Sequence, residues 1–255
     1  MRPTAGRLAR TLVVAIGNTT FLCGVYVGNR CTRMFRLAHP DFGALPRRVG
    51  AHVDRAALCS VVPKLTPKMQ RLMRAQWAIE PRVLTAGSAH GLTIGYRRPQ
   101  ELGTDRLAAA VGARARFPGK NLIVVDCGTA TTVTALRSDG NLLGGAILPG
   151  LSLWPETLAT RTAQLPRIQL ARPRVALGRS PREGIASGVY FGHCGAIREV
   201  VARVRSEAFG RAASIVVGTG GHAALLRREK LFTVLDPELV LSGLLAFSRS
   251  DLSHA

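Results

Sequence analysis

Two stretches of the chain share nearly the same order of apolar, glycine and hydroxyl residues. Each begins with consecutive apolar residues, a pattern typical of a strand covered on both faces, and then enters a glycine and a polar turn. LVVAIGNTT from Leu12 aligns with IVVDCGTAT from Ile123 at an offset of 111 residues. Strand-like residues follow each turn, so both stretches predict a β-hairpin. The repeat indicates two lobes built on one plan.

Strand-like and helix-like segments alternate along the rest of the chain. The pattern predicts strands at 57–62, 81–84, 142–148 and 214–217, and a mixture of helix and loop over 31–56. It predicts helices at 67–80, 104–116, 151–165, 198–209 and 237–247, with another from about residue 182. This alternation is typical of an α/β fold. We expect two tandem lobes, residues 1–116 and 117–255, with a nucleotide in the cleft between them.

Composition narrows the class of protein. With 255 residues, of which 47% are hydrophobic, the chain can bury a large core and is not disordered. Its five cysteines lack the spacing of a disulfide framework or a zinc site, which favours the cytoplasm. The first apolar run is broken by Asn18, Thr19 and Thr20, unlike a signal peptide, and no other run is long enough to span a membrane. We therefore expect no membrane partner.

The net charge of +20 raises the question of polyanion binding. Only Lys64, Lys68, Lys120 and Lys230 are lysines, so 31 of the 35 basic residues are arginines. These are spread along the chain without a dense block interleaved with aromatic residues. We attribute most of them to solvated faces and regard nucleic acid as a less favoured partner. The charge would still attract a nucleoside triphosphate.

The second hairpin carries candidate phosphate chemistry. Asp126 ends an apolar strand, Gly128 allows close backbone approach to a ligand, and Thr129 offers donors for a phosphate. A carboxylate beside such a turn can hold a cation against that phosphate. An ordinary polar turn is the alternative for this motif taken alone. In the first hairpin the corresponding residue is Ala15, so one carboxylate is absent.

A second candidate is Asp105, in the segment Gly103-Thr104-Asp105-Arg106 before an alanine-rich run. It should lie in the first turn of a helix, where acids act as caps or stabilise the helix dipole. The functional alternative is a general base that faces the cleft. Arg106 would pair with a ligand carboxylate or phosphate, or with a surface acid. No Walker phosphate loop occurs.

In this order the segments resemble the type III pantothenate kinases, in the superfamily of sugar kinases, actin and heat-shock ATPases with duplicated ribonuclease-H-like lobes. The resemblance covers nearly the whole chain. It rests on IGNTT at 16–20, CSVVP at 59–63, YRRPQELGTDR at 96–106, VVDCGTATT at 124–132, GGAILPGL at 144–151, TAQLP at 162–166, SGVYFG at 187–192 and TGG at 219–221.

The resemblance implies ATP-dependent phosphorylation of pantothenate to 4'-phosphopantothenate, the first step of coenzyme A synthesis. It implies Mg²⁺, a monovalent cation (K⁺ or NH₄⁺) and a homodimer. Asp105 matches the catalytic base and Asp126 the cation-linked carboxylate. The implied pantothenate contacts are Tyr96, Gly103, Thr104, Arg106, Ser180 and Pro181, and the implied ATP contacts are Ala15, Ile16, Gly17, Asn18, Thr19, Thr20, Gly128 and Thr129.

Two positions depart from the family pattern. Ala15 replaces an aspartate that helps to place magnesium and ATP, and Pro181 replaces a threonine that bonds pantothenate, with Ser180 as the nearest substitute. Two alternatives to a pantothenate kinase therefore stay open. One is a catalytically impaired homologue that acts as a ligand-binding or transcription-accessory regulator, and the other is a kinase of another small hydroxylated acid.

Overall fold

The computed structural model describes residues 8–88 and 90–250, which fall into two compact units. The first comprises Met1–Gly91, Arg98–Ala115 and Val240–Ala255, and the second Leu92–Arg97 and Arg116–Leu239. The sequence predicts one boundary between the lobes, after residue 116. The two units depart from that division in two segments of the chain. The C-terminal helix belongs with the first unit, and a short strand before residue 98 belongs with the second.

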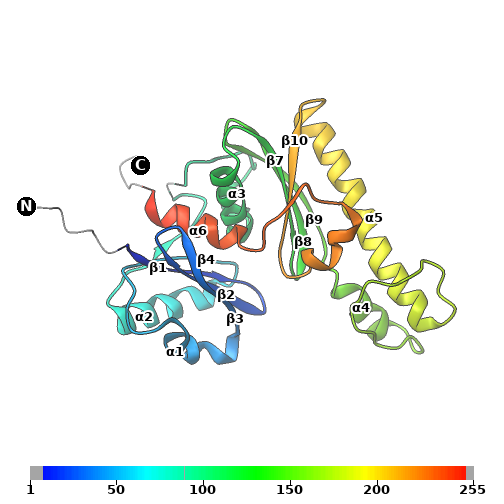
Figure 1. Cartoon of the computed structure of the whole chain (residues 1–255), viewed down its shortest axis with the longest axis horizontal. Coiled ribbons are helices and arrows are strands. Elements are labelled where there is room, and N and C mark those ends of the chain that lie inside the picture. The colour runs from blue at the N-terminus through cyan, green and yellow to red at the C-terminus, as the bar shows by residue number, and fades with distance from the viewer. Residues whose placement is uncertain (1–7, 89, 251–255) are drawn as a thin grey trace, which may run out of the picture. The chain divides into compact units, whose positions relative to one another are not determined.

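The first unit contains a five-stranded sheet in the order β3-β2-β1-β4-β5 (Figure 1). Its strands are β1 (Arg10–Ile16), β2 (Thr20–Val27), β3 (Arg30–Ala38), β4 (Arg55–Ser60) and β5 (Arg82–Val83). Its helices are α1 (Leu45–Val49), α2 (Thr66–Trp77), α3 (Thr104–Arg116) and α6 (Leu239–Arg249), with short 3₁₀ turns at His39–Ala44, Pro63–Leu65 and Pro99–Glu101.

The second unit contains a six-stranded sheet in the order β11-β10-β7-β8-β9-β6. Its strands are β6 (Thr93–Ile94), β7 (Asn121–Cys127), β8 (Ala130–Leu136), β9 (Asn141–Pro149), β10 (Ser214–Thr219) and β11 (Val234–Leu235). Its helices are α4 (Leu153–Arg161) and α5 (Pro181–Phe209), with a 3₁₀ helix at Ala223–Glu229.

The two sheets confirm the predicted repeat. In each, three consecutive antiparallel strands are followed by two parallel strands, β1-β2-β3 with β4 and β5, and β7-β8-β9 with β10 and β11. The strand β6 is an addition to the second sheet, and it pairs with β9 in parallel. The predicted α/β fold is therefore correct, with one sheet in each unit.

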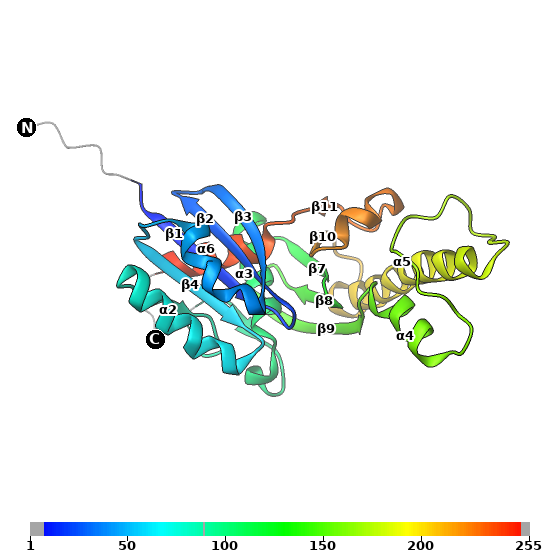
Figure 2. The ribbon, with the colours of Figure 1, turned by 90° about the horizontal axis from the view of Figure 1, so that it is seen from below.

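Helices pack on both faces of the first sheet. Leu12, Val14 and Ile16 of β1 pack with Met69 and Met73 of α2, which runs beside the first sheet in Figure 2. The odd-numbered residues of β1 point to the opposite face, because side chains alternate along a strand. There a Cβ atom at Gly24 of β2 would lie 3.0 Å from Leu241 of α6 and 3.1 Å from Val13, so α6 packs closely over this glycine.

The close packing of α6 against α3 explains why the C-terminal helix joins the first unit. A Cβ atom at Gly243 would lie only 1.9 Å from the carbonyl oxygen of Ala108, so the two backbones meet where neither side chain intervenes. A boundary drawn from sequence order alone cannot include this return of the chain.

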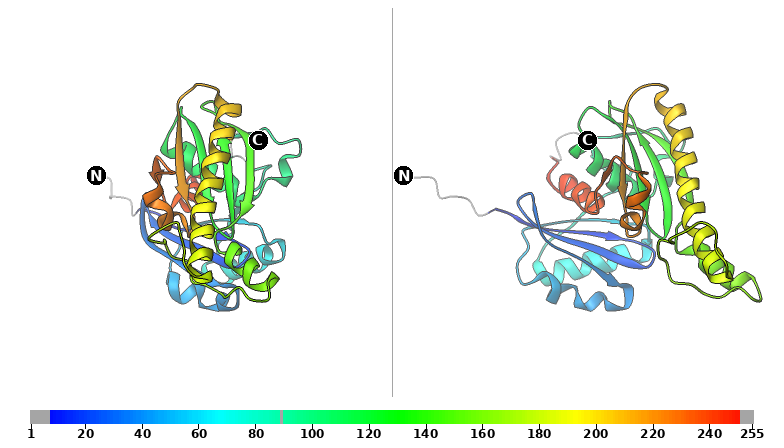
Figure 3. Two further views of the ribbon diagram at one scale, coloured as in Figure 1. Left: turned by 90° about the vertical axis from the view of Figure 1, so that its right-hand side faces the viewer. Right: turned by 45° about the vertical axis from the view of Figure 1, so that its right-hand side comes forward.

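The core of the second unit lies between its sheet and α5. Ile123 and Val125 of β7 pack with Val189 and Ile197 of α5, the long helix that follows the sheet in Figure 3. The N-terminus of α5 is capped as in a capping box, because Ser180 Oγ accepts the Glu183 N–H and Glu183 Oε2 accepts the Arg179 N–H.

Three predicted segments were wrong. Residues 31–56 include a full strand, β3, which is mostly exposed and rich in arginine, so that pairing with β2 and not hydrophobic pattern defines it. The helix predicted at 151–165 is shorter, Leu153–Arg161. The two helices predicted near residues 182 and 198 form one helix, Pro181–Phe209, despite its internal glycines.

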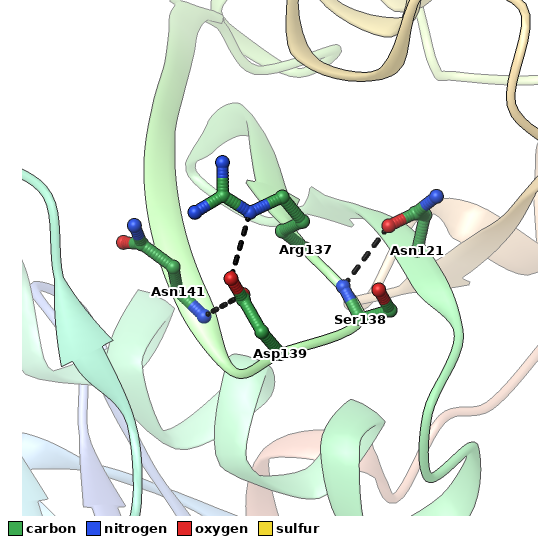
Figure 4. A network of polar contacts seen from close by, with 5 residues as sticks. All are labelled: Asn121, Arg137, Ser138, Asp139 and Asn141. Carbon is green, nitrogen blue, oxygen red and sulfur yellow. Dashed lines mark hydrogen bonds and ion pairs between the residues drawn. The ribbon is translucent and has the colours of Figure 1, made fainter.

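The β8–β9 turn shows how local chemistry closes a hairpin (Figure 4). Asp139 accepts hydrogen bonds from Arg137 Nε and the Asn141 N–H, both at 2.9 Å, and Asn121 Oδ1 accepts the Ser138 N–H. The Asn141 N–H, together with Arg137, lowers the pKa of the Asp139 carboxyl. Gly140 supplies the positive φ of 92°.

All five cysteines are free thiols. Within residues 8–88 and 90–250, no helix combines the length and apolar character needed to cross a bilayer.

Candidate active site

The first predicted phosphate turn joins β1 to β2. The Gly17 N–H donates to the Thr20 carbonyl oxygen at 3.0 Å, and Asn18 and Thr19 are exposed at the tip. Ala15 lies just before this turn and is 8% exposed. Its methyl group offers no oxygen to a metal ion or to a water that would bind one.

His39 supports this turn and had no signal in the sequence. Its Nε2 lies 2.9 Å from the Gly17 carbonyl oxygen, and its ring lies 4.8 Å from that of Phe21. With the proton on Nε2, the imidazole donates to this carbonyl. The contact fixes the peptide between Gly17 and Asn18, whose N–H points the opposite way because the peptide is planar and trans.

Asp105 lies in the first turn of α3, as predicted, and is half-buried. Its Oδ1 accepts the Arg106 N–H at 2.7 Å, so the carboxylate satisfies one amide of the helix start and leaves Oδ2 for other chemistry. Gly103 leaves it room, because a Cβ atom there would lie 2.7 Å from Oδ1. Arg106 is only 6% exposed.

Cys59 connects Ala15 with Asp105. It is the parallel neighbour of Ala15 in β4, so both side chains lie on the same face of the sheet. Burial raises the pKa of the Cys59 thiol, and the nearby Asp105 carboxylate raises it further. The structure thus brings together the missing carboxylate position, a neutral thiol and the predicted base.

In the second unit, Asp126 lies at the end of β7 and is the ladder neighbour of Thr219 in β10. Gly220 follows with φ +90°, and a Cβ atom there would lie 2.3 Å from Asp126 Oδ1. Only glycine fits this approach to the carboxylate. The sequence motif TGG at 219–221 was the one signal of this contact.

The Gly128-Thr129 turn is one residue shorter than its counterpart. The last pair of β7 and β8 is Cys127 with Thr131, whereas that of β1 and β2 is Ile16 with Phe21. Gly128 donates its N–H to the Ala130 carbonyl oxygen at 3.0 Å.

Gly150 supports this shorter turn from below. Its N–H donates to the Thr129 carbonyl oxygen at 3.1 Å, and a Cβ atom on Gly150 would lie 2.1 Å from that oxygen. Its role depends on a contact across the fold and was not predicted.

The predicted substrate residues of the second unit lie at two places. Tyr96 follows β6 and lies over Gly144 of β9, where a Cβ atom would be 3.9 Å from its ring. Ser180 and Pro181 begin α5, and Pro181 lines a cavity of about 750 Å³ with Leu153, Trp154 and Ile185. The Ser180 hydroxyl oxygen accepts the cap bond from Glu183, and its own proton remains to be donated.

A buried histidine lies beneath the second turn. His193 of α5 is 0% exposed, its Nε2 lies 3.2 Å from Thr131 Oγ1, and its ring meets Trp154 edge-on. Burial, with a smaller contribution from His222, lowers the pKa of His193 to about 4. The imidazole is therefore neutral throughout the physiological range.

This lowered pKa predicts acid sensitivity. An unfolded histidine binds a proton below about pH 6.5, and His193 in the folded chain does so only near pH 4, so the free energy of unfolding falls as pH drops between these values. The slope from this group approaches about 1.4 kcal/mol per pH unit. His193→Gln should remove that component in denaturant titrations at pH 7 and 5. Equal pH dependence in both proteins would contradict the assignment.

Comparison with known proteins identifies the family to which this chain is similar. A family model described as type III pantothenate kinase matches residues 11–203, which include both turns and Asp105. A type III pantothenate kinase from Legionella pneumophila is 37% identical over 245 residues, covering 91% of this chain and 96% of the relative. One from Dehalococcoides mccartyi is 33% identical over 254 residues, covering 92% and 95%.

Solved structures agree on the fold. A ROK family glucokinase from Streptomyces griseus, in complex with glucose and AMPPNP, superposes with a TM-score of 0.53 at 14% identity, covering 94% of this chain and 98% of the glucokinase.

Proposed function

The chain belongs to the type III pantothenate kinase family, and from this premise we propose that it transfers the γ-phosphoryl group of ATP to the primary hydroxyl of pantothenate. The observation that carries the proposal is the match over more than nine-tenths of the chain, with Asp105 half-buried at the start of α3. The alternative of a regulator loses support, because the sequence relatives from Legionella pneumophila and Dehalococcoides mccartyi are named as kinases.

Asp105 acts as the general base in this proposal. Oδ1 is held by the Arg106 N–H, so Oδ2 accepts the hydroxyl proton as the pantothenate oxygen attacks phosphorus. Such a base contributes roughly 10²- to 10⁴-fold to the rate, while positioning and charge neutralisation lower most of the barrier.

The two turns contribute to ATP binding. Backbone N–H groups and hydroxyls of Gly17–Thr20 and of Gly128 and Thr129 are donors of the kind that phosphate oxygens accept. The Gly17–Asn18 peptide is already oriented by His39, so its N–H is fixed before a ligand arrives.

Asp126 is the residue that would hold a cation. A single carboxylate beside a phosphate turn fits Mg²⁺ or K⁺ only if phosphate oxygens and water complete the coordination, and the described residues contain no cluster of three acidic, His or Cys side chains for a self-sufficient site. When bound, the cation neutralises charge on the transferring phosphoryl group. Gly220 leaves room for Asp126 Oδ1, because a Cβ atom there would lie 2.3 Å from it.

Pantothenate contacts are assigned to Tyr96, Gly103, Arg106 and the Ser180–Pro181 helix start. The buried guanidinium of Arg106 suits a carboxylate, and Ser180 has a proton to donate. Pro181 has neither a hydroxyl nor a backbone N–H and therefore contributes only apolar surface.

We assign the chain to a homodimer, in the reducing cytoplasm that its free thiols favour. The support is the apolar cavity beside Pro181, together with Val175 and Leu177, which are 63% and 76% exposed. A second copy would cover this apolar surface. Light scattering should give twice the chain mass of 27.2 kDa, and a monomer at assay concentration would contradict the assignment.

The test is direct. Purified protein with ATP, Mg²⁺, K⁺ or NH₄⁺ and pantothenate should form phosphopantothenate, detected by mass spectrometry alongside coupled ADP release. Faster phosphorylation of another small hydroxy acid would identify a different substrate. No product in either the native chain or Ala15→Asp would overturn the proposal.

A further inference from the structure

Ser60, the last residue of β4, has no neighbouring strand residue with which to pair its backbone on one side. In a parallel sheet alternate residues direct their N–H and C=O groups to the same neighbour. Leu58 accepts from the Leu84 N–H on the β5 side, and Val61 donates to Ile16 on the β1 side. Ser60 therefore faces the β5 side, but β5 ends at Val83 and supplies no partner for it.

Thr104 fills this place. Its Oγ1 accepts the Ser60 N–H at 3.0 Å and donates to the Ser60 carbonyl oxygen at 2.9 Å. One side-chain hydroxyl thus replaces the backbone of a missing strand residue, across 44 positions in the sequence.

These two bonds limit the further hydrogen bonds that the Thr104 hydroxyl can make. A hydroxyl has a single proton, and Ser60 already takes it. A bond from Thr104 to an oxygen of pantothenate would leave the Ser60 carbonyl unpaired in a partly buried place, which is unfavourable. The family resemblance groups Thr104 with the substrate contacts, but its geometry gives it another role.

We propose that Thr104 is a positioning residue, which clamps the first turn of α3 to the end of β4 and so fixes the carboxylate of Asp105. This inference rests on the proposed function, in which Asp105 is the base. Thr104 is the first residue of α3 and Asp105 the next, so restraining the one restrains the other.

Loss of the Thr104–Ser60 hydrogen bonds should affect only the start of α3. Residues 107–113 of α3 are buried in the first unit, so the helix holds without the clamp. Thr104 and Asp105 at its start are only half-buried, so this end of the helix frays more readily. The carboxylate of Asp105 lies close to Cys59, the residue before Ser60, so small shifts of this turn displace the base relative to β4. Misplacement of a catalytic group by about 1 Å can cost roughly 100-fold in rate.

Two variants separate positioning from substrate binding. Thr104→Val keeps the shape and removes the hydroxyl, and Thr104→Ser restores it. We expect Thr104→Val to lower kcat roughly 10- to 100-fold with KM for pantothenate within about twofold, and Thr104→Ser to retain most of kcat. A raised KM with unchanged kcat would show a substrate contact instead, and unchanged kinetics would overturn the proposal.

Hydrogen exchange tests the clamp without activity. The Ser60 amide should be protected in the native chain and in Thr104→Ser, and should exchange at least tenfold faster in Thr104→Val. An unprotected Ser60 amide in the native chain would refute the clamp even if Thr104→Val did not fold. If the native chain lacks kinase activity, the proposed function fails, while protection of Ser60 still decides whether the clamp exists.

Discussion

Replacing Asp105 by asparagine should lower kcat for pantothenate phosphorylation by roughly 10²- to 10⁴-fold, the usual contribution of a general base. The amide is isosteric and its oxygen can still accept the Arg106 N–H, so the start of α3 should stay intact. What is lost is the ability to take the hydroxyl proton. Steady-state kinetics with a thermal melt measure both effects.

Asp139→Asn is the matched control for this substitution. It makes the same chemical change at an exposed acid in the β8–β9 turn, where the carboxylate serves only the local hydrogen bonds of Figure 4. Its kcat should equal that of the native chain. If Asp105→Asn keeps full activity, Asp105 is a first-turn acid of α3 and no base, which is the alternative that the sequence left open.

Much of the fold follows from local pattern. The apolar runs before Asp126 and Ala15 predicted β7 and β1, and their repetition predicted two sheets of one topology. The pattern failed at β3, where Arg30, Arg33 and Arg36 hide an edge strand that exists because it pairs with β2. It also failed to show that α6 returns to the first unit, because that depends on contact with α3.

In the candidate site, too, some features follow from the local sequence and others depend on tertiary contacts. The position of Asp105 in the first turn of α3 follows from the residues around it. The bond from Thr104 to Ser60 and the approach of Gly220 to Asp126 span 44 and 94 residues and exist only after the sheets form. His39 at Gly17 is of this kind too. Sequence therefore indicates which groups carry the chemistry, and tertiary contacts determine how they are held.

Ala15→Asp should raise kcat, by up to roughly 1,000-fold if the absent carboxylate limits the reaction, since several kcal/mol of transition-state stabilisation correspond to about that factor. Position 15 is the last but one residue of β1, and its side chain lies beside Cys59, on the face that holds Asp105. An added carboxylate there would help to place the metal ion with ATP.

The same geometry sets a condition on that gain. A second carboxylate near Asp105 raises the free energy of the doubly ionised site unless a cation lies close by. Ala15→Asp should therefore lower the melting temperature without metal and recover it with Mg²⁺ and ATP, whereas Ala15→Asn, of equal size and no charge, should show neither the metal-dependent recovery nor the rate gain. If both variants match a fully active native chain, the carboxylate at position 15 is dispensable here.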